Sequence, residues 1–139
     1  MAINFDSINL EVIDLNTNAS PDIYINLKST TFSKRVLEDM NYPQTVQFCL
    51  DAANKVFAIR VCKGNEVKSI PFSKAKNEQT STLTCRNKNL KEAITTLISD
   101  YNPQKRYKIT GEYDAENRVM YFDMATATPS HHQSCKEQE

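Results

Sequence analysis

Histidine and cysteine, the side chains that most often support nucleophilic catalysis or bind transition metals, form no obvious site in this sequence. The only two histidines, His131 and His132, are adjacent, and Cys135 follows three residues after the second. A metal site needs three or four ligands held so that they converge. We therefore expect no metal site, and with no histidine in the core we expect no Ser-His-Asp or Cys-His arrangement.

Two carboxylates, Asp51 and Asp114, occupy matching places in the similar stretches DAANKV and DAENRV. They could be imagined as a symmetric pair for acid-base chemistry. An aspartate at the start of a hairpin loop ordinarily accepts local backbone N–H bonds, and we favour that structural role. Because the chain has only two glycines, Gly64 and Gly111, it lacks both a P-loop and a dinucleotide-binding fingerprint. We expect no catalytic residue and no cofactor.

Basic residues are the remaining functional signal. The net charge is zero, but residues 55–108 carry twelve Lys and Arg against four Asp and Glu, while the segments on either side are each acidic by four. Charge asymmetry of this kind is typical of an anionic partner, although a solvated polar face is an equal alternative. The basic residues near the two expected helix starts are predicted to contact nucleic-acid phosphates. They are Lys28, Lys34, Arg35, Arg86, Lys88 and Lys91.

A repeat organises the elements that must position these residues. The stretch VQFCLDAANKVFAIRV, residues 46–61, aligns without a gap with ITGEYDAENRVMYFDM, residues 109–124. Apolar residues alternate on both sides of each turn, with Gly111 the exception, so each copy predicts a β-hairpin. We expect Asn54 and Asn117, near the ends of the loops, to adopt the left-handed conformation that Asn tolerates.

A short amphipathic helix is expected before each hairpin. Phe32, Val36, Leu37 and Met40 define the first stripe, and the second, better stripe consists of Leu90, Ala93, Ile94, Leu97 and Ile98. Thr31 and Asn89 are the predicted N-caps, the second with Glu92 in capping-box position. Both helices should stop before a proline, at YPQ and NPQ, residues 42–44 and 102–104.

These elements predict a single α+β domain over residues 1–124. Its two β-α-β-β units, repeat one at 23–62 and repeat two at 81–124, should form one small barrel or sheet with two short helices about a pseudo-two-fold axis. The strand that opens each unit is expected at residues 23–32 and 81–87. Alternation within strands leaves a closed barrel and an open sheet both possible.

Three further segments lie outside the expected units. Residues 3–15 alternate well enough for an additional strand. The connector, residues 63–80, is polar and contains a short apolar spot at 70–72 that could form an edge strand. Residues 125–139 lose periodicity and are predicted to be a flexible tail.

The four cysteines lie far apart, with no C-x-x-C pair, so buried thiols are expected rather than zinc ligands or disulfides. No apolar run approaches the roughly 20 residues needed to cross a bilayer. The first residues do not resemble a signal peptide. We expect a cytoplasmic protein with no membrane partner, either a monomer or a homodimer.

The β-α-β-β unit resembles the AbrB/MraZ (SpoVT-AbrB) family of swapped-hairpin barrels, above all in TTFSKRVLEDMNYPQTVQFCLDAANKVFAIRV. The resemblance covers roughly residues 23–62 and less clearly 81–124. The family's Gly-Arg approach, helix-opening proline and helix-closing glycine are absent from this chain. Members of the family are mostly DNA-binding transcription regulators or antitoxins built from two such units. The resemblance implies the same pairing within one chain.

Together these features predict a small non-enzymatic regulator of bacterial or phage type that binds double-stranded DNA through its basic strand-to-helix loops. The alternative is a protein-interaction module of a mobile genetic element with no nucleic-acid binding, which would use an exposed strand edge or the connector. Both partners, DNA and protein, stay open at this point. Neither reading requires a cofactor or a catalytic group.

Overall fold

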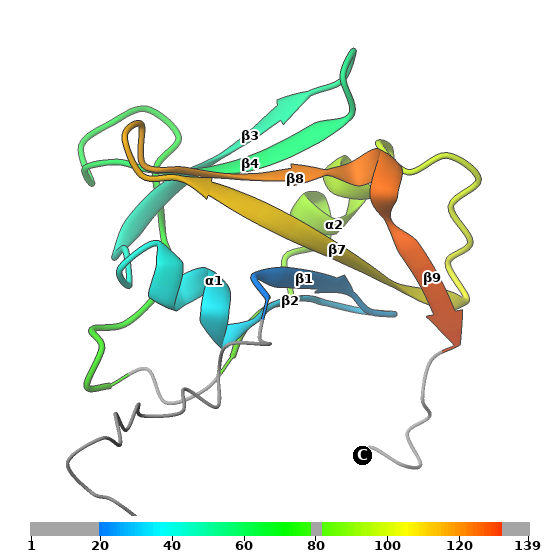
Figure 1. Ribbon diagram of the computed structural model, residues 1–139, viewed down its shortest axis with the longest axis horizontal. Helices are drawn as coiled ribbons and strands as arrows, with labels where there is room; N and C mark the ends of the chain where they lie inside the picture. Colours follow the sequence, from blue (N-terminus) through cyan, green and yellow to red (C-terminus); the bar gives the residue numbers. More distant parts are fainter. Residues whose placement is uncertain (1–19, 79–81, 132–139) are drawn as a thin grey trace, which may run out of the picture.

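The computed structural model describes residues 20–78 and 82–131, and these fold into a mostly stranded, curled antiparallel sheet with two helices (Figure 1). The sheet has the shape of a half-barrel, and its strand order is β5-β3-β4-β8-β7-β1-β2-β6, with β9 paired to β7. The α+β class expected from the sequence is therefore confirmed. Of the two architectures left open, the described strands form the open sheet, because the terminal strands of the order, β5 and β6, do not pair with each other.

The elements follow one another along the chain in a simple order. The strands are β1 (Asp22–Ile25), β2 (Thr30–Phe32), β3 (Thr45–Asp51), β4 (Val56–Val61), β5 (Ile70–Pro71), β6 (Leu83–Cys85), β7 (Lys105–Asp114), β8 (Val119–Asp123) and β9 (Thr128–His131). The helices are α1 (Lys34–Asp39), α2 (Lys88–Thr95) and the single 3-10 turn η2 (Met124–Thr126).

Both predicted hairpins are confirmed. Strand β3 pairs antiparallel with β4, and β7 pairs with β8. The two turns are built alike: the carboxylate of Asp51 accepts hydrogen bonds from the backbone and side-chain nitrogens of Asn54, at 3.2 and 2.8 Å. Asp114 accepts the same pair of bonds from Asn117, at 3.2 and 2.7 Å. These bonds stabilise the charged carboxylate and lower the pKa of both aspartates.

The prediction for the left-handed residue is wrong by one position. The positive φ angles, 56° and 58°, belong to Lys55 and Arg118, each of which follows the asparagine. Asn54 and Asn117 instead use their side chains to hold the aspartate that opens the turn. The left-handed conformation thus belongs to the last residue of each loop, Lys55 or Arg118. The asparagine one residue earlier is held by its hydrogen bonds to the aspartate.

Both predicted helices are present, and both end before the prolines. Their expected apolar stripes are buried at Val36, Leu37, Leu90 and Ile94. The predicted N-caps are wrong. Thr31 lies within β2 and Ser33 precedes α1, whereas Asn87 caps α2 and Asn89 lies inside it.

The cap of α2 can be tested by a matched pair of asparagine variants. The Oδ1 atom of Asn87 accepts a hydrogen bond from the backbone N–H of Leu90 at 3.1 Å. We expect Asn87→Ala to lower the free energy of unfolding by about 1 kcal/mol, the usual cost of losing a cap. Asn89→Ala should change it little, because this exposed position is already helical. Urea unfolding of both variants checks this, and an equal decrease in the two would contradict the assignment.

The first expected strand, residues 23–32, is in fact a hairpin. Strands β1 and β2 pair antiparallel around a tight turn at Asn26–Ser29, closed by a bond of 2.8 Å from the N–H of Asn26 to the carbonyl of Ser29. Phe32 therefore belongs to β2 and not to the helix. The turn contains neither Gly nor Pro, and the Asn26 side chain stabilises it by bonding Ser29 and Thr31.

The edge strand expected in the connector is present as β5, which pairs with β3. The prediction of a flexible tail from residue 125 is wrong over its described part, because η2 and β9 continue the fold. Strand β9 covers the half of β7 that β8 leaves unpaired, with Tyr107 opposite Pro129. The expected strand at 3–15, and His132 and Cys135, lie outside the described residues.

The hydrophobic core lies inside the curl of the sheet, beneath the two helices. Its largest fully buried side chains include Phe32, Phe57, Phe122, Ile94 and Met120. The stacked rings of Phe57 and Phe122 join β4 to β8 at a centroid distance of 5.8 Å. The cysteines expected to be buried are only half-buried at Cys49, Cys62 and Cys85, and all three are free thiols.

Candidate nucleic-acid interface

The β2–β6 pairing determines where the predicted basic residues lie. These strands run antiparallel with Thr31 opposite Thr84, so continuing the register brings the β1–β2 turn beside the start of α2. Lys28 lies in this turn, and Arg86 and Lys88 lie at that helix start. Lys34 and Arg35 begin α1 at the other end of the strand pair, roughly 13 Å away at about 3.3 Å per residue.

Only part of the predicted set therefore converges. Two members of the set that lie away from the turn have local contacts: Arg35 pairs with Asp39 at 2.7 Å, and Lys91 lies over the ring of Tyr101 at 5.7 Å. Lys88 lies 4.0 Å from Glu92 in an exposed and therefore weak pair. Among the described residues, Lys28 and Arg86 have no ion-pair partner.

The start of β7 adds basic residues that the sequence interpretation did not single out. Strand β1 pairs antiparallel with β7, with Ile25 opposite Tyr107, so continuing the register places Asn26 beside Arg106. The Nε atom of Arg106 donates to Oδ1 of Asn26 at 2.8 Å, in agreement with this register. The residues gathered around the β1–β2 turn are hereafter called the basic end. They are Lys28, Arg86, Lys88, Lys105 and Arg106.

Arg106 is held by two of its neighbours. Besides its bond to Asn26, its guanidinium carbon lies 4.2 Å from the ring centroid of Tyr24 on β1. This is a cation–π arrangement, worth roughly 0.5–1 kcal/mol at an exposed site. The guanidinium is thereby fixed in place before any ligand binds, which reduces the entropy that a contact with an anion would cost.

A groove runs from the basic end along the outer face of β7. Alternation along β7 turns Tyr107 and Ile109 into the core and Lys108 and Thr110 outward. The register aligns Lys108 with Tyr24 on one side and with Thr128 on the other. The resulting cavity of about 440 Å³ is hereafter called the outer groove. Its lining includes Tyr24, Arg106, Lys108, Thr110, Thr126 and Thr128.

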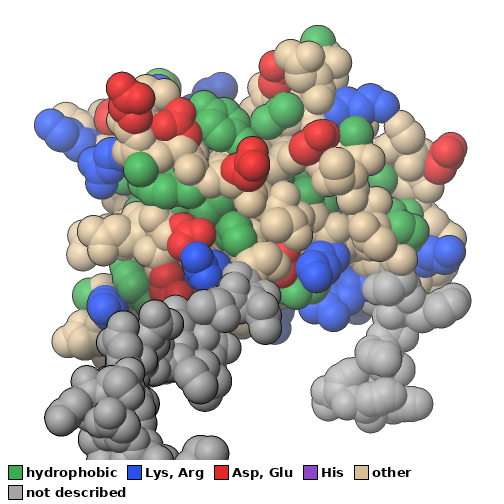
Figure 2. All heavy atoms as spheres, in the orientation of Figure 1, with side chains coloured by type: hydrophobic (Ala, Val, Ile, Leu, Met, Phe, Trp, Pro, Cys, Tyr) green, Lys and Arg blue, Asp and Glu red, His purple; other side chains and the backbone are tan. Residues whose placement is uncertain are grey.

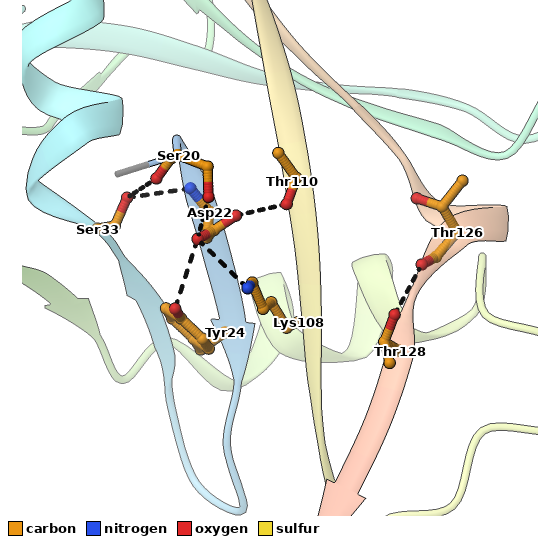
Figure 3. A network of polar contacts seen from close by, with 8 residues as sticks. All are labelled: Ser20, Asp22, Tyr24, Ser33, Lys108, Thr110, Thr126 and Thr128. Carbon is orange, nitrogen blue, oxygen red and sulfur yellow. Dashed lines mark hydrogen bonds and ion pairs between the residues drawn. The ribbon is translucent and has the colours of Figure 1, made fainter. Parts of the chain in front are cut away.

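A buried carboxylate organises the edge of this groove (Figure 3). Asp22 accepts hydrogen bonds from the hydroxyls of Ser20 and Thr110, at 2.7 and 2.5 Å, and Lys108 lies 3.9 Å away. Its side chain is 7% exposed, so these partners are needed to offset the loss of water. Asp22 fixes Thr110 and restrains Lys108, whose ammonium group still reaches solvent.

The surface view agrees with this placement. In Figure 2 one group of blue Lys and Arg side chains lies along the lower right of the face, where the start of β7 and the β1–β2 turn lie in Figure 1, and further blue side chains lie at the upper left and upper right. Red acidic side chains are more frequent in the upper part of the same face. On this face the acidic side chains therefore lie mostly away from the lower right, where the start of β7 and the β1–β2 turn lie.

No acid-base pair is formed by Asp51 and Asp114. Strand β4 pairs antiparallel with β8, with Val56 opposite Asp123 and Arg60 opposite Val119, so the two hairpin turns lie at opposite ends of this pair. Measured along β4, the two turns are four residues apart, or roughly 13 Å at about 3.3 Å per residue. Each aspartate is occupied with its own turn.

Two negative findings apply to the described ranges, 20–78 and 82–131. No three His, Cys, Asp or Glu side chains within them converge as metal ligands would. None of the helices they contain has the length and apolar character needed to cross a bilayer.

Comparison with family models, with curated proteins and with solved structures finds no match.

Proposed function

We propose that this protein is a small non-enzymatic regulator that binds double-stranded DNA through the basic end. The observation that carries the proposal is the pair of strand registers, β2–β6 and β1–β7, that bring five cations from three distant segments around one turn. Contacts from Lys and Arg to phosphates supply most of the affinity in such complexes and position the protein on the duplex.

The outer groove supports the same proposal. Its hydroxyl groups, at Thr110, Thr126 and Thr128, are of the kind that hydrogen-bond phosphate and sugar oxygens. Arg106 joins the groove to the basic end, and its fixed guanidinium suits bidentate binding of a phosphate. A strand of the duplex backbone lying across the β1–β2 turn contacts both features.

We also infer that the chain contains two duplicated units, in keeping with the resemblance to the SpoVT-AbrB family. The β4–β8 register supports this inference. Aligning the two hairpins makes Val56 equivalent to Val119 and Arg60 equivalent to Asp123. The pairs Val56–Asp123 and Arg60–Val119 then exchange with each other, as a two-fold axis near Ala58 and Tyr121 requires.

The outer strands support the inference in the same way. Strand β1 pairs with β7 at Ile23–Ile109, and β5 pairs with β3 at Ile70–Val46, where Ile109 and Val46 are the equivalent positions. Strand β5 is thus the counterpart of β1. Each unit then consists of β-β-α-β-β, one strand more than the sequence pattern predicts.

The DNA-binding proposal is tested by the salt dependence of binding. For a fluorescent duplex titrated by anisotropy, the logarithm of the affinity should fall linearly with the logarithm of the salt concentration. Replacing Arg86 and Lys88 together by Ala should reduce the slope by about 2, because each phosphate that a cation neutralises adds roughly 0.9 to it. The matched control, Lys34→Ala with Arg35→Ala, removes two positive charges at the other end and should leave the slope nearly unchanged.

An equal reduction in both double variants would mean that net charge alone matters and would contradict the assignment to the basic end. Absence of any duplex binding at low salt would contradict the proposal as a whole. It would favour the alternative, a protein-interaction module that uses an exposed strand edge. Circular dichroism of each variant confirms that the fold is kept.

A further inference from the structure

The half-barrel has an open seam between its two terminal strands. Among the described strands, nothing pairs with the outer edge of β5 or of β6. An apolar cavity of about 500 Å³ runs between these edges and the first turns of α2. It is hereafter called the seam groove, and its lining includes Phe48, Leu50, Ile70, Cys85, Leu90 and Ala93.

The seam groove leaves part of the hydrophobic core uncovered by any described segment. Phe48, at its base, packs against Phe32, Phe57 and Phe72, with ring centroids between 5.2 and 6.0 Å apart within this cluster. Leu50, on the same face of β3, is 48% exposed. Contiguous apolar surface of this kind on a small domain usually marks a place where another segment packs.

The two edges are not equally able to receive a strand. Strand β5 ends in Pro71, which has no N–H to donate. Strand β6 uses one side to pair with β2, with Thr84 opposite Thr31, and this leaves the backbone groups of its other side unpaired within the described residues. The edge of β6 is therefore the one that can accept a strand from another segment.

We propose that residues 7–12 of this chain, SINLEV, add a strand antiparallel to β6 and lay Ile8, Leu10 and Val12 into the seam groove. The segment alternates strictly between polar and apolar residues. This pattern suits a strand that has one apolar wall beneath it and water above it. A strand buried on both faces would need a continuous apolar run instead.

The length of the connecting chain permits this placement. Ser20 comes just before β1 and lies near the start of β6. The Oγ of Ser33, just after β2, donates to the carbonyl of Ser20 at 3.3 Å. The residue before Ser33, Phe32, pairs with Leu83, the first residue of β6. The added strand is three strand spacings from β1, or about 14 Å. The seven residues 13–19 span up to about 23 Å when extended. The direction of entry makes the strand antiparallel to β6.

Charge complementarity favours this segment over other occupants. Residues 1–19 contain Asp6, Glu11 and Asp14 and no Lys or Arg. Arg86, Lys88 and Lys91 flank the groove residues at the start of α2. An acidic strand at this place is attracted by the helix start, whereas a basic segment of another protein is repelled.

Cys85 lines the seam groove and reports on its occupancy. In the full chain with Cys49, Cys62 and Cys135 replaced by Ser, only this thiol remains. We expect it to react slowly with a thiol reagent, and we expect Leu10→Asp to accelerate the reaction at least ten-fold, because a charge cannot be buried in the apolar groove. The matched control, Asn9→Asp, adds the same charge on the outward face and should leave the rate unchanged.

A second measurement does not depend on the stability of the charged variant. Leu10→Cys in the same background should form an intramolecular disulfide with Cys85 under mild oxidation, and Asn9→Cys should not. Equal labelling rates for Leu10→Asp and Asn9→Asp, with no disulfide in Leu10→Cys, would overturn the proposal. A labelling rate that falls as protein concentration rises would overturn it in favour of a second copy of the chain.

Discussion

Replacing Phe57 by Ala should lower the free energy of unfolding by about 3–5 kcal/mol, the usual range for a fully buried phenylalanine. Its ring is 0% exposed and lies where the two hairpins meet. It stacks on Phe122 at 5.8 Å and contacts Phe48 at 5.6 Å, so its removal leaves a cavity that both hairpins border. Rigid sheet strands on each side limit how far the cavity can collapse.

The measurement is urea unfolding followed by far-UV circular dichroism, with Tyr121→Ala as the control. Tyr121 lies on the adjacent strand β8 but is 41% exposed, so its truncation should cost much less. Equal decreases for the two variants would show that the β4–β8 contact is not the centre of the core.

Gly111→Val should be the other strongly destabilising change, by about 1–3 kcal/mol or more. A Cβ atom built at Gly111 meets the Cε2 and Cδ2 atoms of Phe122 at 2.6 and 2.8 Å and the carbonyl oxygen of Tyr121 at 2.9 Å. The ring can turn away only into the packed core, and the carbonyl belongs to the β7–β8 pair. The strand must therefore shift for any side chain to fit.

A double-mutant cycle identifies the cause of this destabilisation. In the Phe122→Ala background the ring is gone, so the additional cost of Gly111→Ala should fall below its cost in the wild-type protein. An unchanged cost would place the conflict with the backbone of Tyr121 and not with the ring. Thermal unfolding of the four proteins provides the comparison.

The same pair explains the one break in the sequence repeat. In the first hairpin Phe48 lies opposite Ile59, and in the second Gly111 lies opposite Phe122. The aromatic residue of this pair is on the first strand, β3, in the first hairpin and on the second strand, β8, in the second hairpin. Gly111, having no side chain, leaves space for the ring of Phe122. Gly111 is thus an exception in the alternation of β7 because its neighbour fills the space.

Features set by local physics could be predicted from the sequence. The hairpins follow from apolar alternation around an Asp-to-Asn turn, and the two helices follow from the apolar stripes that include Val36, Leu37, Leu90 and Ile94. The split of residues 23–32 into β1 and β2 could not be predicted so easily. Its turn has no Gly or Pro and depends on the side-chain bonds of Asn26.

The candidate site was predicted in part, for a different physical reason. Lys28, Arg86 and Lys88 could be named from their charge and their closeness to helix starts, but their convergence depends on the pairing of β2 with β6, more than fifty residues apart. Arg106 and Lys108 alternate with the core residues Tyr107 and Ile109, and this pattern could have placed them on an outer face. Their neighbours in β1 and β9 depend on tertiary pairing alone.

Mapping the contact on the protein shows whether duplex DNA binds at the basic end. Backbone amide shifts of the ¹⁵N-labelled full chain should be followed while a short duplex is added at low salt. We expect the largest changes at Asn26–Ser29, Arg86–Lys88 and Lys105–Lys108. Changes confined to the start of α1, at Lys34 and Arg35, or the absence of any change, would contradict this expectation.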